Sequence, residues 1–197
     1  MKLILASTSV SRQKILKKFN LAFDCVAPDC DETPYPNEEA INLVQRLSRI
    51  KAESVAKQYA NRIIIGSDQV GVLNKQIIGK PHTVENAIKQ LQACSGKTIH
   101  FYTGLTVMHT GNQQSITVYE PFSVTFRHLS LAEICAYIEK EQPLYCAGSF
   151  KCDELGITLF DKLTGEDINT LIGLPLIRLN KILIEMGYNP LLQSNHT

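Results

Sequence analysis

Three consecutive isoleucines, Ile63–Ile65, are the feature that most restricts how this chain can fold. A strand with one face in water alternates apolar and polar residues, whereas a continuous β-branched run indicates a strand that is buried on both faces. We therefore expect residues 62–67 to form a central strand covered by helices on both sides. Asp68 would then stand at or just past the carboxyl end of this strand, where open α/β sheets tend to bind ligands.

Strand and helix patterns alternate around this run through the first hundred residues, and the second half is richer in strand patterns. Such alternation is typical of an α/β fold, and a mixed β-sheet flanked by helices accounts for both halves. Asn37 is the expected cap of the longest helix, Thr83 is the expected cap of the helix that ends near Cys94, and Ser130 with Glu133 forms a capping box. The predicted strands are 3–6, 22–27, 62–67, 70–73, 76–78, 98–108 and 114–127, and the predicted helices are 10–19, 37–59, 83–94, 130–140 and 175–186.

Length and composition exclude several classes of protein. A chain of 197 residues with 44% hydrophobic and 20% charged residues is typical of one globular domain, here taken as residues 1–197. A formal net charge of +1 provides no field to hold a nucleic-acid polymer. No apolar run approaches the ~20 residues that span a bilayer, so we expect no membrane association. The six cysteines include no C-x-x-C pair, which favours reduced thiols and a cytoplasmic location.

The turn from Ser7 to Arg12 is the first candidate for a binding site. It follows a strand and opens a helix, and it offers four hydroxyls and a guanidinium in six residues. Unpaired backbone N–H groups at such a helix start attract anions, phosphates above all. The alternative is a serine-capped helix with basic residues facing solvent. The chain has no G-x-x-x-x-G-K-[ST] motif, which excludes a P-loop ATPase.

Lys51 is the second candidate, because it interrupts an apolar helix face formed by Val44, Leu47 and Val55. A lysine in such a place either extends its ammonium to the rim or reaches a buried anion.

Acidic and basic side chains in two loops complete the set of candidates. Glu32 lies in a proline-rich loop and Lys80 lies between Gly79 and Pro81. Alone, the loop that contains Glu32 resembles a solvated loop, the loop that contains Lys80 is a weak signal, and Asp68 resembles a turn residue. Together, Glu32 and Asp68 can hold Mg²⁺ through oxygen, while lysines and arginine neutralise a polyphosphate. That combination suits displacement at phosphorus.

These segments, in this order, resemble the Maf family of nucleoside triphosphate pyrophosphatases from Leu3 to about Leu192. The fold implied by the resemblance is an elongated α/β structure with two lobes around a cleft, similar to inosine triphosphatases. The matching segments are Leu5-Ala6-Ser7-Thr8-Ser9 with Arg12, Asp31-Glu32-Thr33, Lys51, Gly66-Ser67-Asp68-Gln69 and Gly79-Lys80-Pro81.

The resemblance also implies an activity and roles for individual residues. Family members hydrolyse a nucleoside triphosphate to the monophosphate and pyrophosphate with Mg²⁺ or Mn²⁺. Asp68 looks like the proton acceptor that activates water, or like a metal ligand, and Glu32 looks like a metal ligand. Triphosphate contacts are implied for Ser7, Arg12, Lys51 and Lys80.

One branch of the family, which acts on 7-methyl-GTP, is the most similar. Gln69 and the segments 146–151, 155–157 and 169–175 carry this similarity. Ser11, Gln69 and Asp153 match the family's specificity positions. A carboxylate at 153 suits 7-methylguanine, which is cationic. The chain departs from this pattern at Val10, where the family often has Pro, at Ser11, where this branch often has an aromatic residue, and at Asp153, where the branch usually has Glu.

We therefore expect an enzyme that removes 7-methyl-GTP before it is incorporated into nucleic acid. The alternatives are a dTTP/UTP pyrophosphatase of the same family and a non-catalytic nucleotide-binding regulator of cell division. A homodimer is the expected assembly, since dimers are the commonest soluble oligomers.

Overall fold

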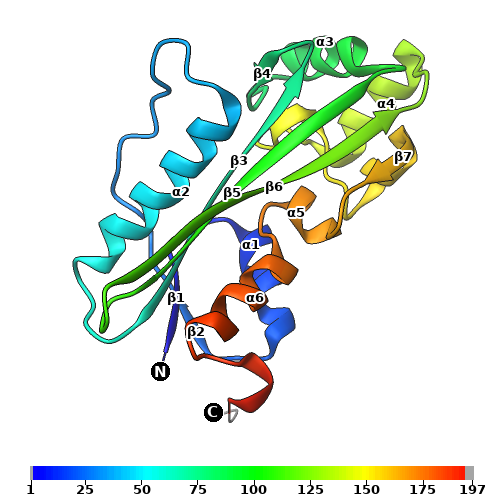
Figure 1. Ribbon diagram of the computed structural model, residues 1–197. Coiled ribbons are helices and arrows are strands. Elements are labelled where there is room, and N and C mark those ends of the chain that lie inside the picture. The colour runs from blue at the N-terminus through cyan, green and yellow to red at the C-terminus, as the bar shows by residue number, and fades with distance from the viewer. Residues whose placement is uncertain (1, 194–197) are drawn as a thin grey trace. The chain divides into compact units, whose positions relative to one another are not determined.

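The predicted mixed α/β fold is confirmed by a computed structural model, which describes residues 2–193 (Figure 1). In the described part of the chain, one sheet contains seven strands in the order β2-β1-β3-β5-β6-β7, with β4 paired to β3. The strands are β1 (Leu3–Leu5), β2 (Phe23–Cys25), β3 (Ile63–Leu73), β4 (Gln76–Ile78), β5 (Thr98–His109), β6 (Gln114–Phe126) and β7 (Phe160–Thr164). The α-helices are α1 (Val10–Leu16), α2 (Ala40–Ala56), α3 (Val84–Cys94), α4 (Leu131–Glu141), α5 (Ile168–Ile172) and α6 (Leu176–Glu185).

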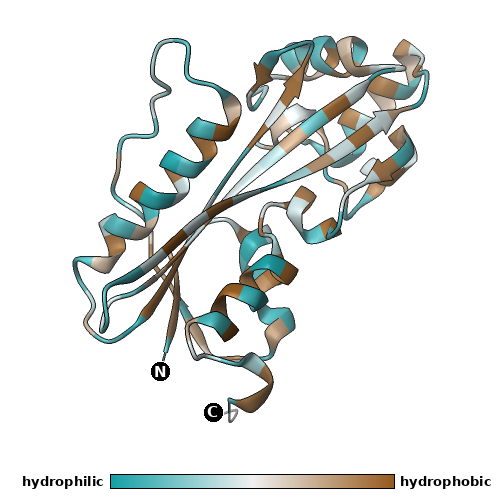
Figure 2. Cartoon of the chain, in the orientation of Figure 1, coloured by the Kyte–Doolittle hydropathy of each residue, from teal (hydrophilic) through white to brown (hydrophobic). Residues whose placement is uncertain are grey.

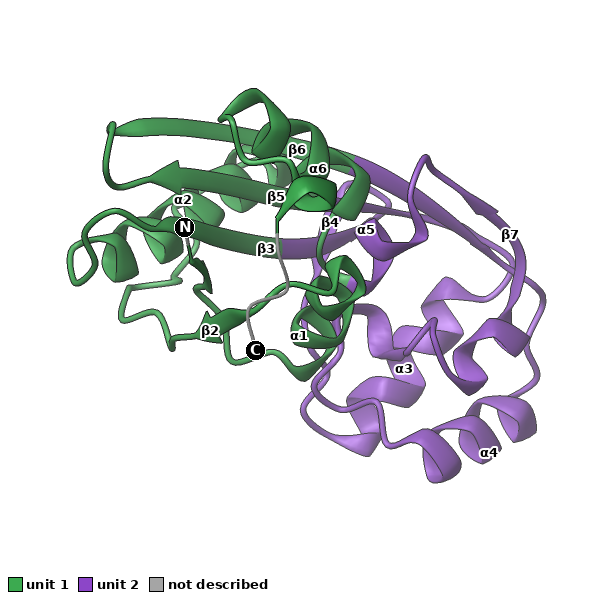
Figure 3. Ribbon diagram, turned by 90° about the horizontal axis from the view of Figure 1, so that it is seen from below, with its two compact units in different colours: residues 1–68, 103–120, 173–197 green, residues 69–102, 121–172 purple. Residues whose placement is uncertain are grey.

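The chain divides into two compact units (Figure 3). Unit 1 contains the residues up to Asp68, residues 103–120 and the residues from Gly173 onward, and unit 2 contains residues 69–102 and 121–172. Strands β3, β5 and β6 contribute residues to both units. The expected cleft between two lobes stays a prediction. Over residues 2–193, no helix combines the length and the apolar character needed to cross a membrane.

The core of unit 1 forms around the isoleucine run, as its pattern predicted. Strand β1 pairs in parallel with β2 on one side and with β3 on the other, with Ile4 opposite Ile64. All three isoleucines are 0% exposed, which confirms that this part of β3 is covered on both faces. Helices α2 and α6 provide the cover on opposite faces (Figures 1 and 3). Apolar and polar residues alternate around α2 (Figure 2), and its Ala52 and Val55 pack on Ile4 and Ile64.

Strand β3 is longer than the sequence indicated. The sequence predicts two separate strands here, 62–67 and 70–73, and Gly66 and Asp68 near the break are poor strand formers. Instead β3 runs to Leu73, and Asp68 lies inside it rather than at its end. The parallel pairing with β1 does stop at Ile65, and the pairing with β5 keeps the following residues extended. The predicted hairpin to β4 is confirmed, with Asn74 and Lys75 both at positive φ.

The core of unit 2 is built around packed phenylalanines. Phe150 meets Phe101, Phe126 and Phe160 edge to face, with ring centroids 5.0 to 5.6 Å apart. This geometry is the favourable one for aromatic pairs. Helices α3 and α4 contribute Leu91 and Ile138 to the same core.

Two of three predicted helix caps are confirmed. Thr83 caps α3 by accepting from Asn86 N, and the capping box of Ser130 with Glu133 opens α4. Hydrogen bonds from Ser130 and from Arg127, together with the positive charge of Arg127, lower the pKa of the exposed Glu133 carboxyl to about 2. The expected cap of α2 is wrong: Asn37 adopts a left-handed conformation in the preceding turn, and α2 begins after Glu39.

Two glycines allow α2 to lie unusually close to the sheet of unit 1. A Cβ on Gly66 would collide with the carbonyl oxygen of Ser48, and a Cβ on Gly104 would collide with that of Val44. Between these contacts, the buried Ser48 hydroxyl is hydrogen-bonded to Thr106 of β5 at 3.0 Å. At Gly66 and Gly104, the backbone of α2 therefore rests directly on the backbone of β3 and β5.

We expect Gly66→Ala to lower the free energy of unfolding by about 1–3 kcal/mol, the usual cost of overpacking a core. The new methyl group must push α2 away from β3, because the atom that it meets is backbone. Urea denaturation followed by circular dichroism measures the change. Gly79→Ala is the matched control, since no atom lies within 4 Å of the added Cβ. Equal stability of the two variants would contradict the close packing.

Candidate functional site

A buried lysine joins two carboxylates at the centre of unit 1. Lys51 Nζ donates to Asp68 Oδ1 at 2.6 Å and lies 2.7 Å from Glu32 Oε2. The side chain of Lys51 is 7% exposed, that of Asp68 12% and that of Glu32 52%. The sequence left two alternatives for the Lys51 ammonium, the rim of the helix face or a buried anion. The structure supports the buried anion.

Local sequence explains why these groups meet. Val44, Leu47, Lys51 and Val55 are all buried, so the predicted apolar face of α2 is the one that rests on the sheet. Side chains two residues apart on a strand share a face, which places Asp68 on the same face as Ile64 and Gly66. That face is the one covered by α2. Glu32 arrives from the loop between β2 and α2.

Arg12 is held by a carbonyl group from a distant part of unit 1. Its Nε donates to Gly173 O at 2.8 Å, and Ser67 Oγ lies 2.9 Å from the same oxygen. Burial lowers the pKa of the Arg12 guanidinium, and the negative charges of Asp68 and Glu32 oppose that shift. Arg12 therefore belongs electrostatically to the same cluster as Lys51.

The serines before α1 make local hydrogen bonds. Ser9 caps α1 by accepting from Arg12 N, and Ser7 Oγ accepts from Ser9 N at 3.1 Å. Ser7 is buried at the end of β1, whereas Ser11 is half-buried in the first turn of α1. The serine-capped helix is thus present, and phosphate binding by Ser7 stays a prediction.

Three further candidates lie in unit 2. Gln69 follows Asp68 on β3 and donates its amide to the carbonyl oxygens of Thr170 and Leu171, at 2.8 and 3.0 Å. Lys80 and Asp153 are both exposed. They lie close enough to Cys146 for Lys80 to lower and Asp153 to raise the pKa of its thiol, although burial is the largest cause of the upward shift.

Glu32 and Asp68 have the donor chemistry that a divalent metal requires. In residues 2–193, no group of three or more His, Cys, Asp and Glu side chains is arranged to hold a metal ion. Two carboxylates suffice for Mg²⁺, however, because it is commonly bound by one or two of them together with substrate phosphates and water. Both carboxylates already converge on one cation, the Lys51 ammonium. The residues therefore fit the expected metal.

Sequence reasoning missed the residues that position Arg12. Ser67 was treated only as part of a motif, and Gly173 was treated as part of a segment typical of one branch. Gly173 has φ +124°, a conformation that side chains disfavour. A glycine before Leu174-Pro175 was the available signal, but only the fold shows that its carbonyl meets Arg12.

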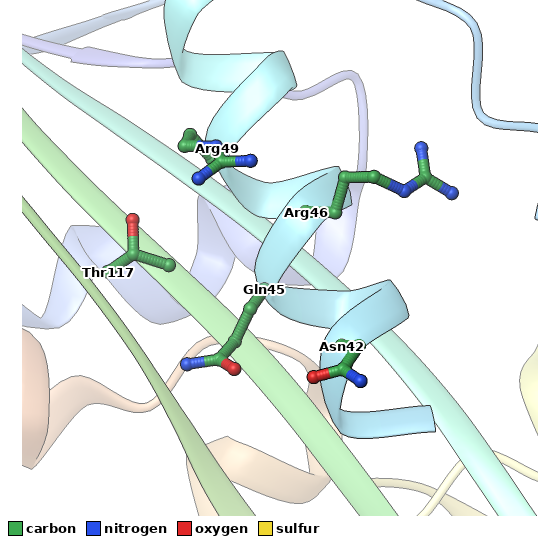
Figure 4. A pocket seen from close by; sticks show the side chains of 5 residues that line it. All are labelled: Asn42, Gln45, Arg46, Arg49 and Thr117. Atoms are coloured by element: carbon green, nitrogen blue, oxygen red, sulfur yellow. The ribbon is translucent and has the colours of Figure 1, made fainter. Parts of the chain in front are cut away.

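A separate pocket of about 300 Å³ lies beside α2 in unit 1 (Figure 4). It is lined by Asn42, Gln45, Arg46, Arg49 and Thr117, none of which is a predicted site residue. Figure 4 shows the Arg46 guanidinium pointing away from Thr117. That guanidinium is paired with Glu38 through two hydrogen bonds and stacks on the Tyr35 ring at 4.0 Å. Much of the positive charge beside this pocket is therefore already neutralised.

Comparison with known proteins places the chain in a family. The family model described as Maf-like protein matches residues 2–186, and the chain therefore belongs to the Maf family, as the motifs indicated. A protein of Aliivibrio fischeri named 7-methyl-GTP pyrophosphatase is 55% identical over 96% of this chain and 98% of its own length. A protein of Pseudoalteromonas translucida with the same name is 51% identical over 99% of this chain and 96% of its own length. Among solved structures, the Ham1 protein of Staphylococcus aureus is 15% identical, with a TM-score of 0.47 over 64% of this chain and 72% of that chain.

We expect Arg12→Lys to weaken the binding of a nucleoside triphosphate by about 10- to 150-fold, since hydrogen bonds to charged groups contribute about 1.5–3 kcal/mol. Lysine retains the charge but loses the planar fork, whose Nε donates to the Gly173 carbonyl and whose other donors would be available to a phosphate. Titration calorimetry measures the change. Arg49→Lys, on the exposed side of α2, should bind as tightly as the wild type. An Arg12→Lys protein with unchanged affinity would remove Arg12 from the binding site.

Proposed function

We propose that this chain hydrolyses 7-methyl-GTP to 7-methyl-GMP and pyrophosphate, which prevents incorporation of the modified nucleotide into nucleic acid. The observation that carries the substrate is the identity of more than half of its residues, over nearly the full length, with two relatives named 7-methyl-GTP pyrophosphatase. The ion-paired group of Lys51, Asp68 and Glu32 supports the chemistry, because it combines a carboxylate base with a cation for the phosphates.

In the proposed reaction, Asp68 accepts a proton from a water molecule whose oxygen attacks the α-phosphorus. The bond between the α-phosphorus and the oxygen that bridges to the β-phosphorus breaks, and pyrophosphate leaves with the bonding electron pair. Lys51 and Arg12 bind the triphosphate and neutralise the negative charge that develops on its oxygens. The family resemblance adds Ser7 and Lys80 as triphosphate contacts.

Glu32 and Asp68 are the proposed ligands of Mg²⁺ or Mn²⁺. When bound, such a metal neutralises phosphate charge and favours attack at phosphorus. Asp68 thus has two proposed roles, proton acceptor and metal ligand, which the experiment on Asp68 below separates.

The proposed specificity residues are Ser11, Gln69 and Asp153. The Asp153 carboxylate attracts the positive charge that methylation places on the purine, and it can accept from a guanine N–H. Gln69 already donates its amide to the α5 backbone, so its contribution is to hold the position of this part of unit 2.

Pyrophosphate release from a nucleotide panel tests the proposed function. We expect 7-methyl-GTP to be hydrolysed with a higher kcat/KM than GTP, dTTP or UTP, and Asp153→Asn to reduce its advantage over GTP. Asp161→Asn, on an exposed residue of β7, is the matched control. Faster turnover of UTP and dTTP would assign the chain to the other branch. Tight binding without turnover under Mg²⁺ or Mn²⁺ would favour a non-catalytic regulator.

Asp68→Asn should lower kcat by at least about a hundredfold, since general bases contribute about 10²- to 10⁴-fold. The amide oxygen can still accept from Lys51, so we expect the fold to persist, with an unchanged circular dichroism spectrum. Asp24→Asn, which removes an exposed ion pair with Lys2, should leave kcat unchanged.

Binding of Mn²⁺ to the Asp68→Asn protein separates the two roles of Asp68. Retained affinity assigns it to proton transfer, and lost affinity assigns it to the metal. Near-normal turnover in this variant would exclude both roles.

A further inference from the structure

The Lys51 ammonium occupies the position between the two carboxylates that are proposed to bind the metal. Its nitrogen lies within 2.7 Å of one oxygen of Asp68 and one oxygen of Glu32. A metal bound between these two side chains would take the position of the ammonium and draw on the same two carboxylates. The ammonium and the metal are therefore competitors for one set of ligands.

The charges of the cluster favour this competition. Two carboxylates that converge on one point repel each other unless a cation lies between them. Lys51 supplies that cation, and Arg12 is the second positive group that senses Asp68 and Glu32. Two negative and two positive charges leave the cluster neutral. Adding a divalent cation to a neutral, largely buried cluster is unfavourable, unless anionic groups arrive with it.

A nucleoside triphosphate supplies those anionic groups. The lysine side chain is a compact charge on a flexible four-carbon stem, so its ammonium can exchange one set of oxygens for another. Phosphate oxygens satisfy the ammonium when the carboxylates are taken by the metal. The Lys51 ammonium thus has an anionic partner whether or not the metal is bound, and its buried charge is compensated in both cases.

We propose that Lys51 holds the metal ligands in place and couples metal binding to nucleotide binding. The Glu32 and Asp68 carboxylates would then hold the metal while the Lys51 ammonium binds the triphosphate, so each ligand would strengthen the binding of the other. This inference rests on the proposed function for the identity of the nucleotide. The competition for the carboxylates rests only on the contacts of Lys51.

The test measures Mn²⁺ binding by electron paramagnetic resonance, with and without an α,β-methylene analogue of 7-methyl-GTP that cannot be hydrolysed. In the wild type, we expect the analogue to tighten Mn²⁺ binding by about 5- to 150-fold, the usual range for coupled sites. Lys51→Met should bind Mn²⁺ alone more tightly than the wild type, and the analogue should then add little. A merely structural role for Lys51 would lower Mn²⁺ affinity on substitution rather than raise it.

Three further proteins complete the experiment. Lys57→Met, which removes an exposed lysine at the end of the same helix, should behave as the wild type. Lys51→Arg retains a cation and should not gain Mn²⁺ affinity. Glu32→Gln should weaken Mn²⁺ binding, which assigns the signal to this site.

The outcomes distinguish this inference from the proposed function. An unchanged or lower Mn²⁺ affinity in Lys51→Met overturns the inference, even if the wild type hydrolyses 7-methyl-GTP. Higher affinity in that variant supports the competition, even if no nucleotide in the panel is hydrolysed. If Lys51→Met does not fold, the wild type alone decides, because Mn²⁺ binding that is independent of the analogue overturns the coupling.

Discussion

The close packing of α2 on β3 and β5 is the constraint on which the candidate site depends. Because Gly66 and Gly104 have no side chains, the helix backbone lies directly against the strands. A lysine stem has limited reach, and Lys51 meets Asp68 at 2.6 Å only because the helix is this close. The weak strand formers Gly66 and Ser67 are thus retained for packing and for the support of Arg12, and pairing with β5 keeps them extended.

The close packing brings charged side chains together away from solvent, and their burial makes them depend on one another. An ion pair at the surface contributes little, whereas a buried charge that loses its partner is strongly destabilising. Asp68 and Lys51 are both largely withdrawn from solvent, so each needs the other. Glu32, half exposed, adds a negative charge that Lys51 and Arg12 together balance. The cluster therefore has little net charge, and any anion or cation that enters it changes this balance of charge.

Much of this arrangement could be predicted from the sequence, for identifiable reasons. The isoleucine run and the apolar face of α2 indicate directly which side chains are buried, and the predicted burial of both is confirmed. Contacts between residues far apart could not be predicted in the same way. Gly173 is 161 residues from Arg12, and no local pattern indicates that its carbonyl accepts from the guanidinium. The end of β3 was misplaced for a related reason: local propensity marks Gly66 to Asp68 as a strand end, and pairing with a later strand overrides it.

The choice of lysine rather than arginine at position 51 follows from the same geometry. A guanidinium is a rigid planar fork that pairs best with both oxygens of one carboxylate. An ammonium is a point charge with three donors in a cone, and it can serve one oxygen from each of two carboxylates, as Lys51 does for Asp68 and Glu32. Arg12, in contrast, is anchored by the Gly173 carbonyl, where a fork with several donors is an advantage. The two cations of the cluster thus differ in kind: Arg12 has a fixed anchor, and Lys51 has only partners that other ions can replace.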